Sequence, residues 1–199
     1  MDGFTGSKTA TTEELPKAVA VMDPFHVIHL VAQALQECRH RVQQDCHGRR
    51  GPAGDPLFEG RRLLLTGATL HTEKQCRKVQ EVLGRDEYVP VAATWGVYQA
   101  MVDAYRQKDR RVGKSTIRRV IDSLGSGGAE RPVEINRLGR TLVKRAGDIL
   151  AYFDRPGTSN GPAEAINGRG RAPTWFGPGV EGIWRTTWPG VCWRLVGSG

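Results

Sequence analysis

The chain has 199 residues, 39% of them hydrophobic, and a formal net charge of +8, which provides enough apolar content for one packed domain. The excess of Lys and Arg suits a polyanionic partner, usually nucleic acid, although a soluble basic protein with a solvated charged surface has the same composition. No run of about 18 apolar residues is present, which excludes a membrane-spanning helix and a membrane partner. Residues 1–15 are polar and carry no secretory signal pattern, so we expect a cytoplasmic protein.

The four cysteines form no Cys-x-x-Cys pair. A zinc site is one interpretation of the group made by Cys38, His40, Cys46 and His47. However, Cys38 and His40 lie two positions apart on an expected helix, so their side chains diverge. We therefore favour reduced thiols, as is usual in the cytosol.

The first expected elements are a short strand and a long helix. The apolar run from Ala18 to Met22 ends at Asp23-Pro24, which is typical of a buried strand that leads into a turn. Asp23 is also a good N-cap, and Pro24 a good first residue, for the helix that follows. One apolar face of this helix is marked by Val27, Leu30, Val31, Ala34, Leu35, Cys38 and Val42.

Further helical segments follow a basic loop, rich in Gly and Pro, at residues 46–56. Residues 57–65 are expected to form a short helical piece, and Thr72 with Gln75 predicts a capping box for a helix that Gly84 ends. The next helix carries an aromatic stripe. Core packing is favoured there over a stacking platform for bases, and the marking residues are Trp95, Tyr98, Val102 and Tyr105.

The remaining periodic segments also predict helices. The first runs through Ile117, Val120, Ile121 and Leu124 and is ended by the sequence GSGG at 125–128. A long helix is then marked by Ile135, Leu138, Leu142, Ala146, Ile149 and Phe153, and its other sides carry Arg137, Arg140, Lys144 and Arg145. After a break, Pro162 fits the first turn of a new helix. Because the strand signal is confined to the first 25 residues, we expect a chain that is mostly α.

Three acidic residues stand out as candidates for chemistry: Asp2, Asp23 and Glu164. Each also has an ordinary explanation. Asp23 suits a helix cap, Glu164 suits the positive first turn of a helix, and Asp2 suits a frayed terminus.

Longer stretches around these residues resemble a known family. The segments MDGFTGSKTA, ELPKAVAVMDPFHV and LGRTLVKRAGDILAYFDRPGTSNGPAEAING are similar to insertion-sequence DDE transposases of the ISL-three group, from residue 1 to about residue 169. The resemblance implies an α/β fold by descent with a large all-α insertion. It divides the chain into a partial ribonuclease-H-like core at 1–26, a helical insertion at 27–155, and the start of a Glu-bearing catalytic helix at 156–169.

The resemblance also implies a site. Asp2 would be the second catalytic Asp and Glu164 the catalytic Glu, both binding Mg²⁺ or Mn²⁺ in a two-metal site that cleaves a phosphodiester and joins the freed 3′ hydroxyl to target DNA. Asp23 and His26 would form the Asp-x-x-His motif of the family, in which His26 organises either the substrate or the acidic network. DNA phosphates would be contacted by Arg137, Arg140, Lys144 and Arg145. The family generally acts as multimers, which makes a homo-oligomer a possible state.

Two departures from the family pattern predict that this chain is an inactive, truncated fragment. The first catalytic Asp of the family has no counterpart in the chain. Residues 170–199 hold four of the five Trp and show no period for burial, and with free codon choice "GIWRTTWPGVCWRLVGS" can be encoded so that another frame resembles the Leu-rich tail of the family. We therefore predict a frameshift there, with a genuine Trp-rich binding tail as the other interpretation. The alternative function is a non-catalytic basic DNA-binding or transposition-inhibiting module.

Overall fold

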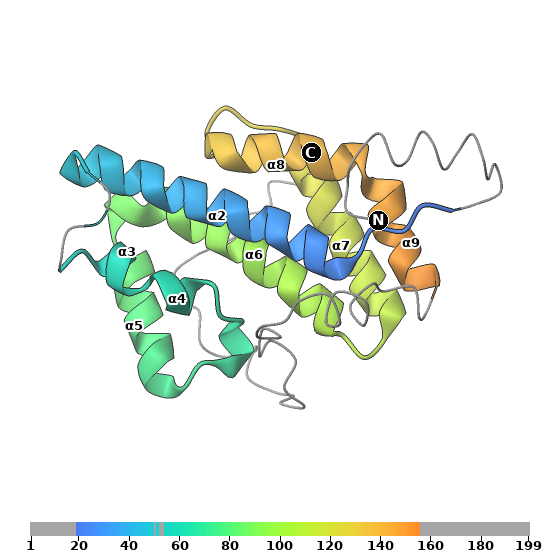
Figure 1. Cartoon of the computed structure of the whole chain (residues 1–199), viewed down its shortest axis with the longest axis horizontal. Coiled ribbons are helices and arrows are strands. Elements are labelled where there is room, and N and C mark those ends of the chain that lie inside the picture. Colours follow the sequence, from blue (N-terminus) through green and yellow to red (C-terminus); the bar gives the residue numbers. More distant parts are fainter. Residues whose placement is uncertain (1–18, 50, 52–53, 156–199) are drawn as a thin grey trace, which may run out of the picture.

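A computed structural model describes residues 19–49, 51 and 54–155, and within these residues the chain is helical, with no strand (Figure 1). None of the described helices is long and apolar enough to cross a membrane. The elements are α2 (Pro24–His47), α3 (Pro56–Glu59), α4 (Arg61–Leu64), the short 3-10 helix η1 (Ala68–Leu70), α5 (Glu73–Leu83), the short 3-10 helix η2 (Asp86–Tyr88), α6 (Val89–Arg106), α7 (Arg110–Gly125), α8 (Val133–Lys144) and α9 (Ala146–Asp154).

Helix α2 begins and ends as its sequence predicts. The Asp23 side chain accepts a hydrogen bond from the backbone N–H of Phe25 at 2.8 Å, and Pro24 is the first helical residue. At the other end Gly48 adopts a left-handed φ of 66°, a conformation that glycine takes without a Cβ clash. Of the predicted apolar face, the buried members are Val27, Val31, Ala34, Leu35, Cys38 and Val42.

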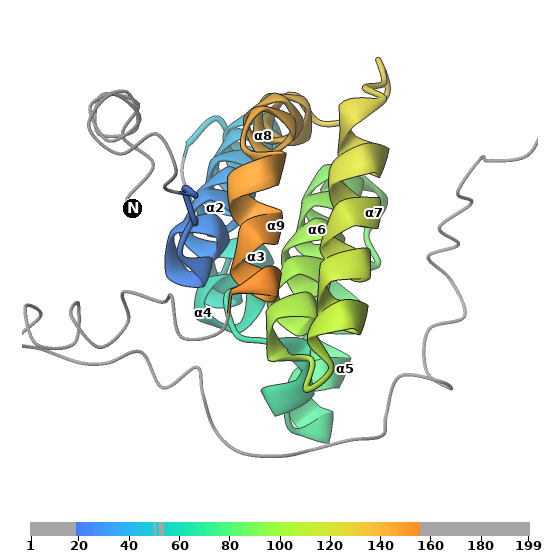
Figure 2. The same ribbon diagram turned by 90° about the vertical axis from the view of Figure 1, so that its right-hand side faces the viewer.

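Helices α2, α6, α7, α8 and α9 pack as one bundle. Helix α6 lies between α2 and α7, while α8 lies against both α7 and α2, and Figure 2 shows it end-on, between these two helices and above α9. All of these helices contribute to a single hydrophobic core. The predicted aromatic stripe of α6 is part of this core, because Tyr98 is fully buried and Trp95 and Tyr105 are partly buried against it.

The short helices α3, α4 and α5 form a side group next to the bundle, at the lower left in Figure 1. They account for the short helical piece predicted at residues 57–65. The capping box that begins α5 is confirmed: the Thr72 hydroxyl accepts from the Gln75 backbone N–H at 3.4 Å, and the Gln75 side chain accepts from the Thr72 N–H at 2.8 Å. Gly84 ends the helix, as predicted.

The strand predicted over Ala18–Met22 is wrong for its described part. Residues 19–22 have no regular structure, and Val19 is 49% exposed. Only Met22 is buried, and its N–H donates to the Asp148 carbonyl oxygen at 2.9 Å. A strand needs a partner strand for its ladder of hydrogen bonds, and the part of the chain described here offers none.

The single long helix predicted through Ile135 and Phe153 is also wrong, because the structure divides it into α8 and α9. The junction is Arg145, whose φ of −106° and ψ of 8° depart from helical values. Both helices bury their apolar faces in the same core, so the spacing of apolar residues continues through the bend and does not reveal it.

Candidate nucleic-acid interface

The two predicted catalytic and metal-binding residues, Asp2 and Glu164, lie outside the described residues. So do residues 1–18 of the predicted core at 1–26, the predicted start of the Glu-bearing helix at 156–169, and the tail at 170–199. What the structure does describe is the Asp-x-x-His motif, the ends of the helical unit between these segments, and the predicted DNA-binding cations.

The Asp-x-x-His motif lies at the start of α2. Asp23 is only 5% exposed, and its carboxylate caps the helix, so the ordinary role considered for it is confirmed. His26 is the third residue of α2, within its first turn, and is partly buried. The Tyr105 side chain of α6 is close enough to Asp23 to interact with it electrostatically. Burial raises the pKa of the Tyr105 phenol, and the nearby Tyr152 and Asp23 raise it further. Asp23 therefore occupies a corner where α2, α6 and α9 meet.

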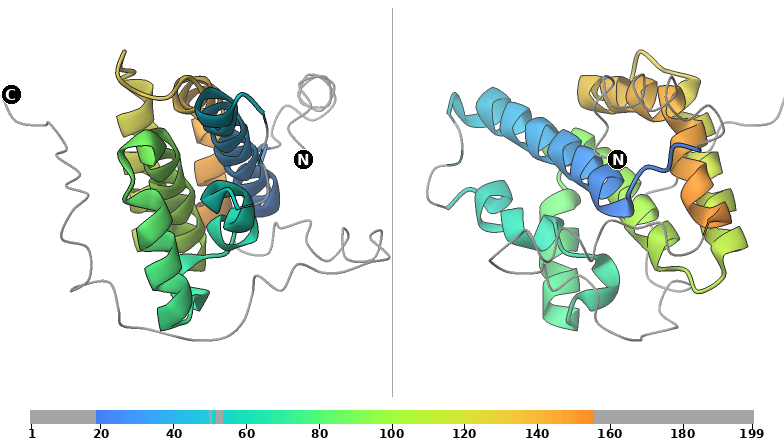
Figure 3. Two further views of the ribbon diagram at one scale, coloured as in Figure 1. Left: turned by 90° about the vertical axis from the view of Figure 1, so that its left-hand side faces the viewer. Right: turned by 45° about the vertical axis from the view of Figure 1, so that its right-hand side comes forward.

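The described unit begins and ends at this same corner. The bond from the Met22 N–H to the Asp148 carbonyl joins the chain just before α2 to the first turn of α9. From Asp148 to Asp154, α9 advances by about 9 Å, at 1.5 Å per residue. The closeness of the two ends can be followed in Figure 3, where the chain leading into α2 passes beside α9. A unit with adjacent ends can interrupt another fold without separating the parts on either side.

Three of the four predicted DNA-binding cations share one surface. Arg137, Arg140 and Lys144 are all exposed, and their spacing of three and four residues places them on the outer side of α8. We call these three residues the α8 stripe. Arg137 forms an ion pair with Glu37 of α2, whereas Arg140 and Lys144 form no ion pair with any acid in the described ranges.

Arg145 does not belong to this surface. Its side chain is 13% exposed and pairs with Asp148 at 3.4 Å, across the bend between α8 and α9. Its position at the junction indicates a structural contact. The prediction that it lies on a polar side of one long helix assumed a helical period that ends with α8.

The inner side of α8 is held by a pair that the sequence did not reveal. Glu134 is 5% exposed, and its two carboxylate oxygens accept from Nε and Nη2 of Arg41 at 2.8 and 3.1 Å. Burial by itself would raise the pKa of Glu134, but the hydrogen bonds and charge of Arg41 outweigh it, and the pKa is lowered. The two residues are 93 positions apart, so no local pattern connects them.

Close packing at Gly139 brings α8 onto α7. A Cβ at this position would lie 2.8 Å from the Leu124 carbonyl oxygen, which no real side chain tolerates without a shift. Glycine is therefore required for this approach of the two helices. The contact continues to the end of α7, where a Cβ on Gly125 would lie 3.0 Å from Cγ2 of Val143.

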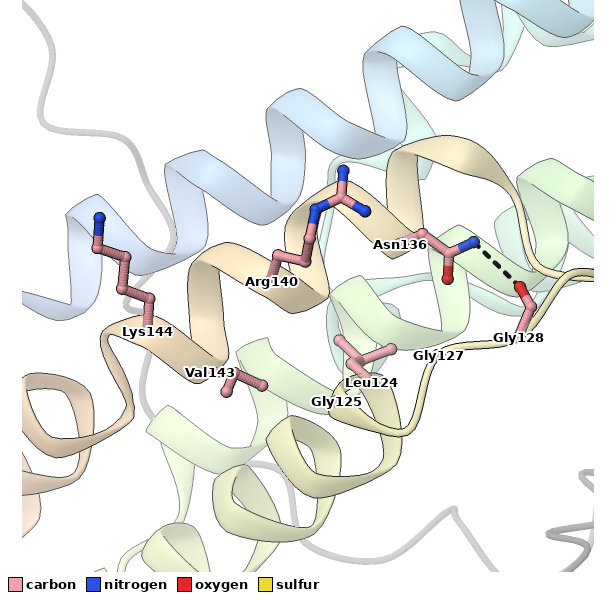
Figure 4. Close-up of a pocket in the computed structure, with 8 residues that line it drawn as sticks. All are labelled: Leu124, Gly125, Gly127, Gly128, Asn136, Arg140, Val143 and Lys144. Carbon is pink, nitrogen blue, oxygen red and sulfur yellow. Dashed lines mark hydrogen bonds between the residues drawn. The ribbon is translucent and has the colours of Figure 1, made fainter.

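A groove opens beside the α8 stripe, between the end of α7 and α8 (Figure 4). Its volume is about 500 Å³. One side is lined by Leu124 and the glycines of residues 125–128, and the other by Asn136, Arg140, Val143 and Lys144. We call it the α8 groove. Sequence reasoning missed it because the GSGG segment indicated only the end of a helix.

No metal site is found among residues 19–49, 51 and 54–155, where no group of three or more His, Cys, Asp or Glu side chains is arranged to hold an ion. In the Cys/His group considered for zinc, Cys38 is buried and Cys46 is exposed. The thiols of Cys38, Cys46 and Cys76 are free.

Comparison with known proteins identifies a family. A family model for DDE transposases of the ISL3 type, described as a transposase, matches residues 1–174. The match includes both the described helical unit and the positions of Asp2 and Glu164. No curated protein matches the chain, and no solved structure matches it.

Proposed function

Because this chain belongs to the ISL-three group of DDE transposases, whose function is DNA transposition, we propose that its helical unit binds DNA through the α8 stripe. The observation that carries this proposal is the outward face of α8, where Arg137, Arg140 and Lys144 lie exposed in a row. Such cations neutralise phosphates and release counterions, which gives affinity without sequence preference.

The stripe is presented on a rigid element. The buried Glu134–Arg41 pair and the close contact at Gly139 fix α8 against α2 and α7. Because α8 is packed against α2 and α7 on its inner side, the helix loses little conformational freedom when a phosphate binds to its cations. This favours the DNA backbone as the ligand of this surface.

The catalytic part of the proposal concerns the segments on either side of the helical unit. Asp2 and Glu164 supply hard carboxylate oxygens, the donors that Mg²⁺ and Mn²⁺ prefer. Their segments join the unit at residues 22 and 155, and the adjacency of Met22 and Asp148 supports their convergence on one site. With the metal ions bound, such a site activates the attacking oxygen and stabilises the leaving oxygen. Asp23 and His26 lie beside this corner, where they would order that site.

In this family three carboxylates bind the metal ions, and Asp2 and Glu164 provide two of the three. We therefore expect this chain to bind DNA but to bind metal weakly and to transfer no strands by itself. The alternative, a non-catalytic DNA-binding or transposition-inhibiting module, makes the same prediction for binding. Metal-dependent nicking of DNA that Asp2→Ala or Glu164→Ala abolishes would contradict the expected inactivity. Salt-dependent DNA binding that survives both substitutions would support the non-catalytic module.

The predicted frameshift remains part of the proposal. Its support is the change in character after residue 169, with four Trp in residues 170–199, and the end of the family match at residue 174. Sequencing the surrounding DNA in all frames tests it directly. A shifted frame that restores a Leu-rich helix supports the frameshift, and a DNA sequence with no such frame removes it.

The DNA-binding proposal is tested by replacing two matched pairs of basic residues with alanine. Arg140→Ala/Lys144→Ala removes one Arg and one Lys from the α8 stripe, and Arg77→Ala/Lys74→Ala removes the same two residue types from the exposed side of α5. Fluorescence anisotropy with a labelled duplex, measured as salt is raised, should show that the first pair lowers the salt slope by about two and the second leaves it nearly unchanged. Equal effects of the two pairs would contradict the proposal.

A further inference from the structure

Helix α7 carries more positive charge than any other helix of the described unit. Its sequence contains five basic side chains and one acid, Asp122. Two of the five stabilise the fold: Arg110 donates to two backbone carbonyl oxygens at the end of α9, and Lys114 pairs with Asp154 at 2.6 Å. The remaining three do not serve the packing of α7 in this way.

These three side chains, Arg111, Arg118 and Arg119, are exposed and form no ion pair with any acid in the described part of the chain. Two acids lie close to them in the sequence. Asp109 caps the helix, because its carboxylate accepts from the backbone N–H of Arg111 at 2.8 Å. Asp122 is exposed one turn beyond Arg118, where it offsets part of the charge. The outer side of α7 still keeps an excess of positive charge, which attracts a polyanion.

Two of the three arginines lie on the side of α7 that leads to α8. Arg111, Arg118 and Gly125 are spaced seven residues apart, which places them on nearly the same side of the helix at intervals of about 10 Å. We call Arg111 and Arg118 the α7 row. At the end of this row a Cβ on Gly125 would lie 3.0 Å from Cγ2 of Val143, the residue before Lys144. The α7 row therefore runs toward the α8 groove, and the α8 stripe lies on the other side of that groove.

The turn between the two helices carries little that would keep a ligand away. Residues 125–128 include three glycines, and Figure 4 shows them along one side of the α8 groove. No described atom lies within 4 Å of the Cβ that Gly127 lacks. The acid of this connection, Glu130, is not among the residues that line the groove. A phosphate backbone can thus cross from one helix to the other without meeting a bulky side chain or a negative charge.

We propose that the α7 row extends the α8 stripe, so that one DNA duplex lies across the α8 groove with its phosphates on both helices. This inference rests on the DNA binding proposed above for the α8 stripe. From Gly125 to Arg111, α7 advances by about 21 Å, and from Arg137 to Lys144, α8 advances by about 10 Å. A duplex presents several phosphates to a surface of this length, since each strand carries one about every 3.4 Å.

Paired substitutions in the full-length chain test this extension, with the salt slope of duplex binding as the measurement. Arg111→Ala/Arg118→Ala should lower the slope by about two, because two phosphate contacts are lost. Arg111→Lys/Arg118→Lys keeps both charges and should keep the original slope. The control is Arg62→Ala/Arg77→Ala, which removes two exposed arginines from α4 and α5 and should leave the slope nearly unchanged. Circular dichroism confirms that each variant retains the helix content of the original chain.

The outcomes separate this inference from the proposal on which it depends. If Arg140→Ala/Lys144→Ala lowers the slope and the α7 pair behaves like the control, the extension is wrong and the α8 stripe is unaffected. If only the α7 pair lowers the slope, the α8 proposal fails, and the extension fails with it. If neither pair changes the slope, both proposals fail.

Stoichiometry distinguishes one continuous surface from two separate ones. Titration with a duplex of about ten base pairs, which is about 34 Å long, is carried out well above the dissociation constant. The proposal expects no more than one duplex per chain, and it expects that combining the α7 and α8 pairs lowers the salt slope by about four. Two duplexes per chain, reduced to one by either pair of substitutions, would show separate sites and overturn the proposal.

Discussion

Helices α5 and α8 are both short and rich in cations on their exposed side, but the charges are arranged differently. On α5, Lys74, Arg77 and Lys78 alternate with the exposed acids Glu73 and Glu81. In addition, Lys78 is paired with Glu59 of α3 at 3.7 Å. On α8 the one acid, Glu134, is buried on the inner side. On the outer side of α8, Glu37 of α2 offsets Arg137 and the charges of Arg140 and Lys144 remain to attract a polyanion, whereas the charges of α5 largely cancel.

The two helices also differ in how they are held. Helix α8 packs against α7, α2 and α9, while α5 contacts α4 and α6 at the edge of the molecule. Cations are common on exposed helices, and most of them serve only as a solvated face. The comparison indicates that a basic helix becomes a candidate DNA surface when its acids face inward and its back is fixed.

The largest expected effect comes from matched core truncations under the two helices. Leu142 of α8 is 0% exposed and Leu83 of α5 is 3% exposed. We expect Leu142→Ala to lower the free energy of unfolding by about 3 kcal/mol and Leu83→Ala by about 2 kcal/mol, because the edge site collapses more easily around a cavity. Urea denaturation measures both values. A greater loss for Leu83→Ala would contradict the view that α8 is the better-anchored helix.

A second comparison tests the close approach of α8 to α7. Gly139→Ala places a Cβ 2.8 Å from the Leu124 carbonyl oxygen, so we expect a loss of about 2 kcal/mol as the helices move apart. Gly147→Ala in α9 meets nothing within 4 Å, and the higher helix propensity of Ala should make it neutral or stabilising by up to about 1 kcal/mol. The midpoint of thermal unfolding should fall for Gly139→Ala and should stay the same or rise for Gly147→Ala. A fall in both variants would contradict the steric explanation.

A third test uses the pH dependence that the Glu134–Arg41 pair imposes. The folded protein lowers the pKa of Glu134 below its ordinary value of 4.5, so the pair stabilises the fold above that value and its contribution is lost as the pH falls below it. Because Arg41 is 37% exposed, we expect Glu134→Gln to cost only about 1–2 kcal/mol at pH 7. Urea titrations at neutral and acidic pH should show the difference from the original chain shrinking in acid. If the difference in stability did not change with pH, the cost of Glu134→Gln would come from packing and not from the ion pair.

The sequence predicted most helices of this unit because their signals are local. The cap at Asp23, the capping box at Thr72 and the stops at Gly84 and Gly125 each depend on a few adjacent residues. The bend at Arg145 was missed because the apolar period continues through it. The residues at 19–22 were misassigned because an apolar run alone does not distinguish a strand from a segment that buries one side chain.

The candidate interface could be predicted only in part, for a related physical reason. Helical spacing predicted that Arg137, Arg140 and Lys144 lie away from the apolar face, and all three are exposed. The α8 groove and the buried pair depend on which residues the fold brings together, such as Glu134 and Arg41 at a separation of 93 positions. Their positions follow from helix packing, which a single sequence does not record.

The smallest expected effect concerns the start of α5. Thr72→Ala removes the hydroxyl that caps the Gln75 N–H, and we expect a loss of about 1 kcal/mol, with fraying of the first turn of α5. Hydrogen exchange should show faster amide exchange at the start of α5 and unchanged exchange in α8, because α5 lies at the edge of the molecule and shares few contacts with the bundle. DNA binding should stay unchanged, since Lys74 and Arg77 are not assigned to the DNA surface. If this local change weakened DNA binding as strongly as the loss of Arg140 and Lys144, the distinction between the two basic helices would fail, and α5 would have to be included in the interface.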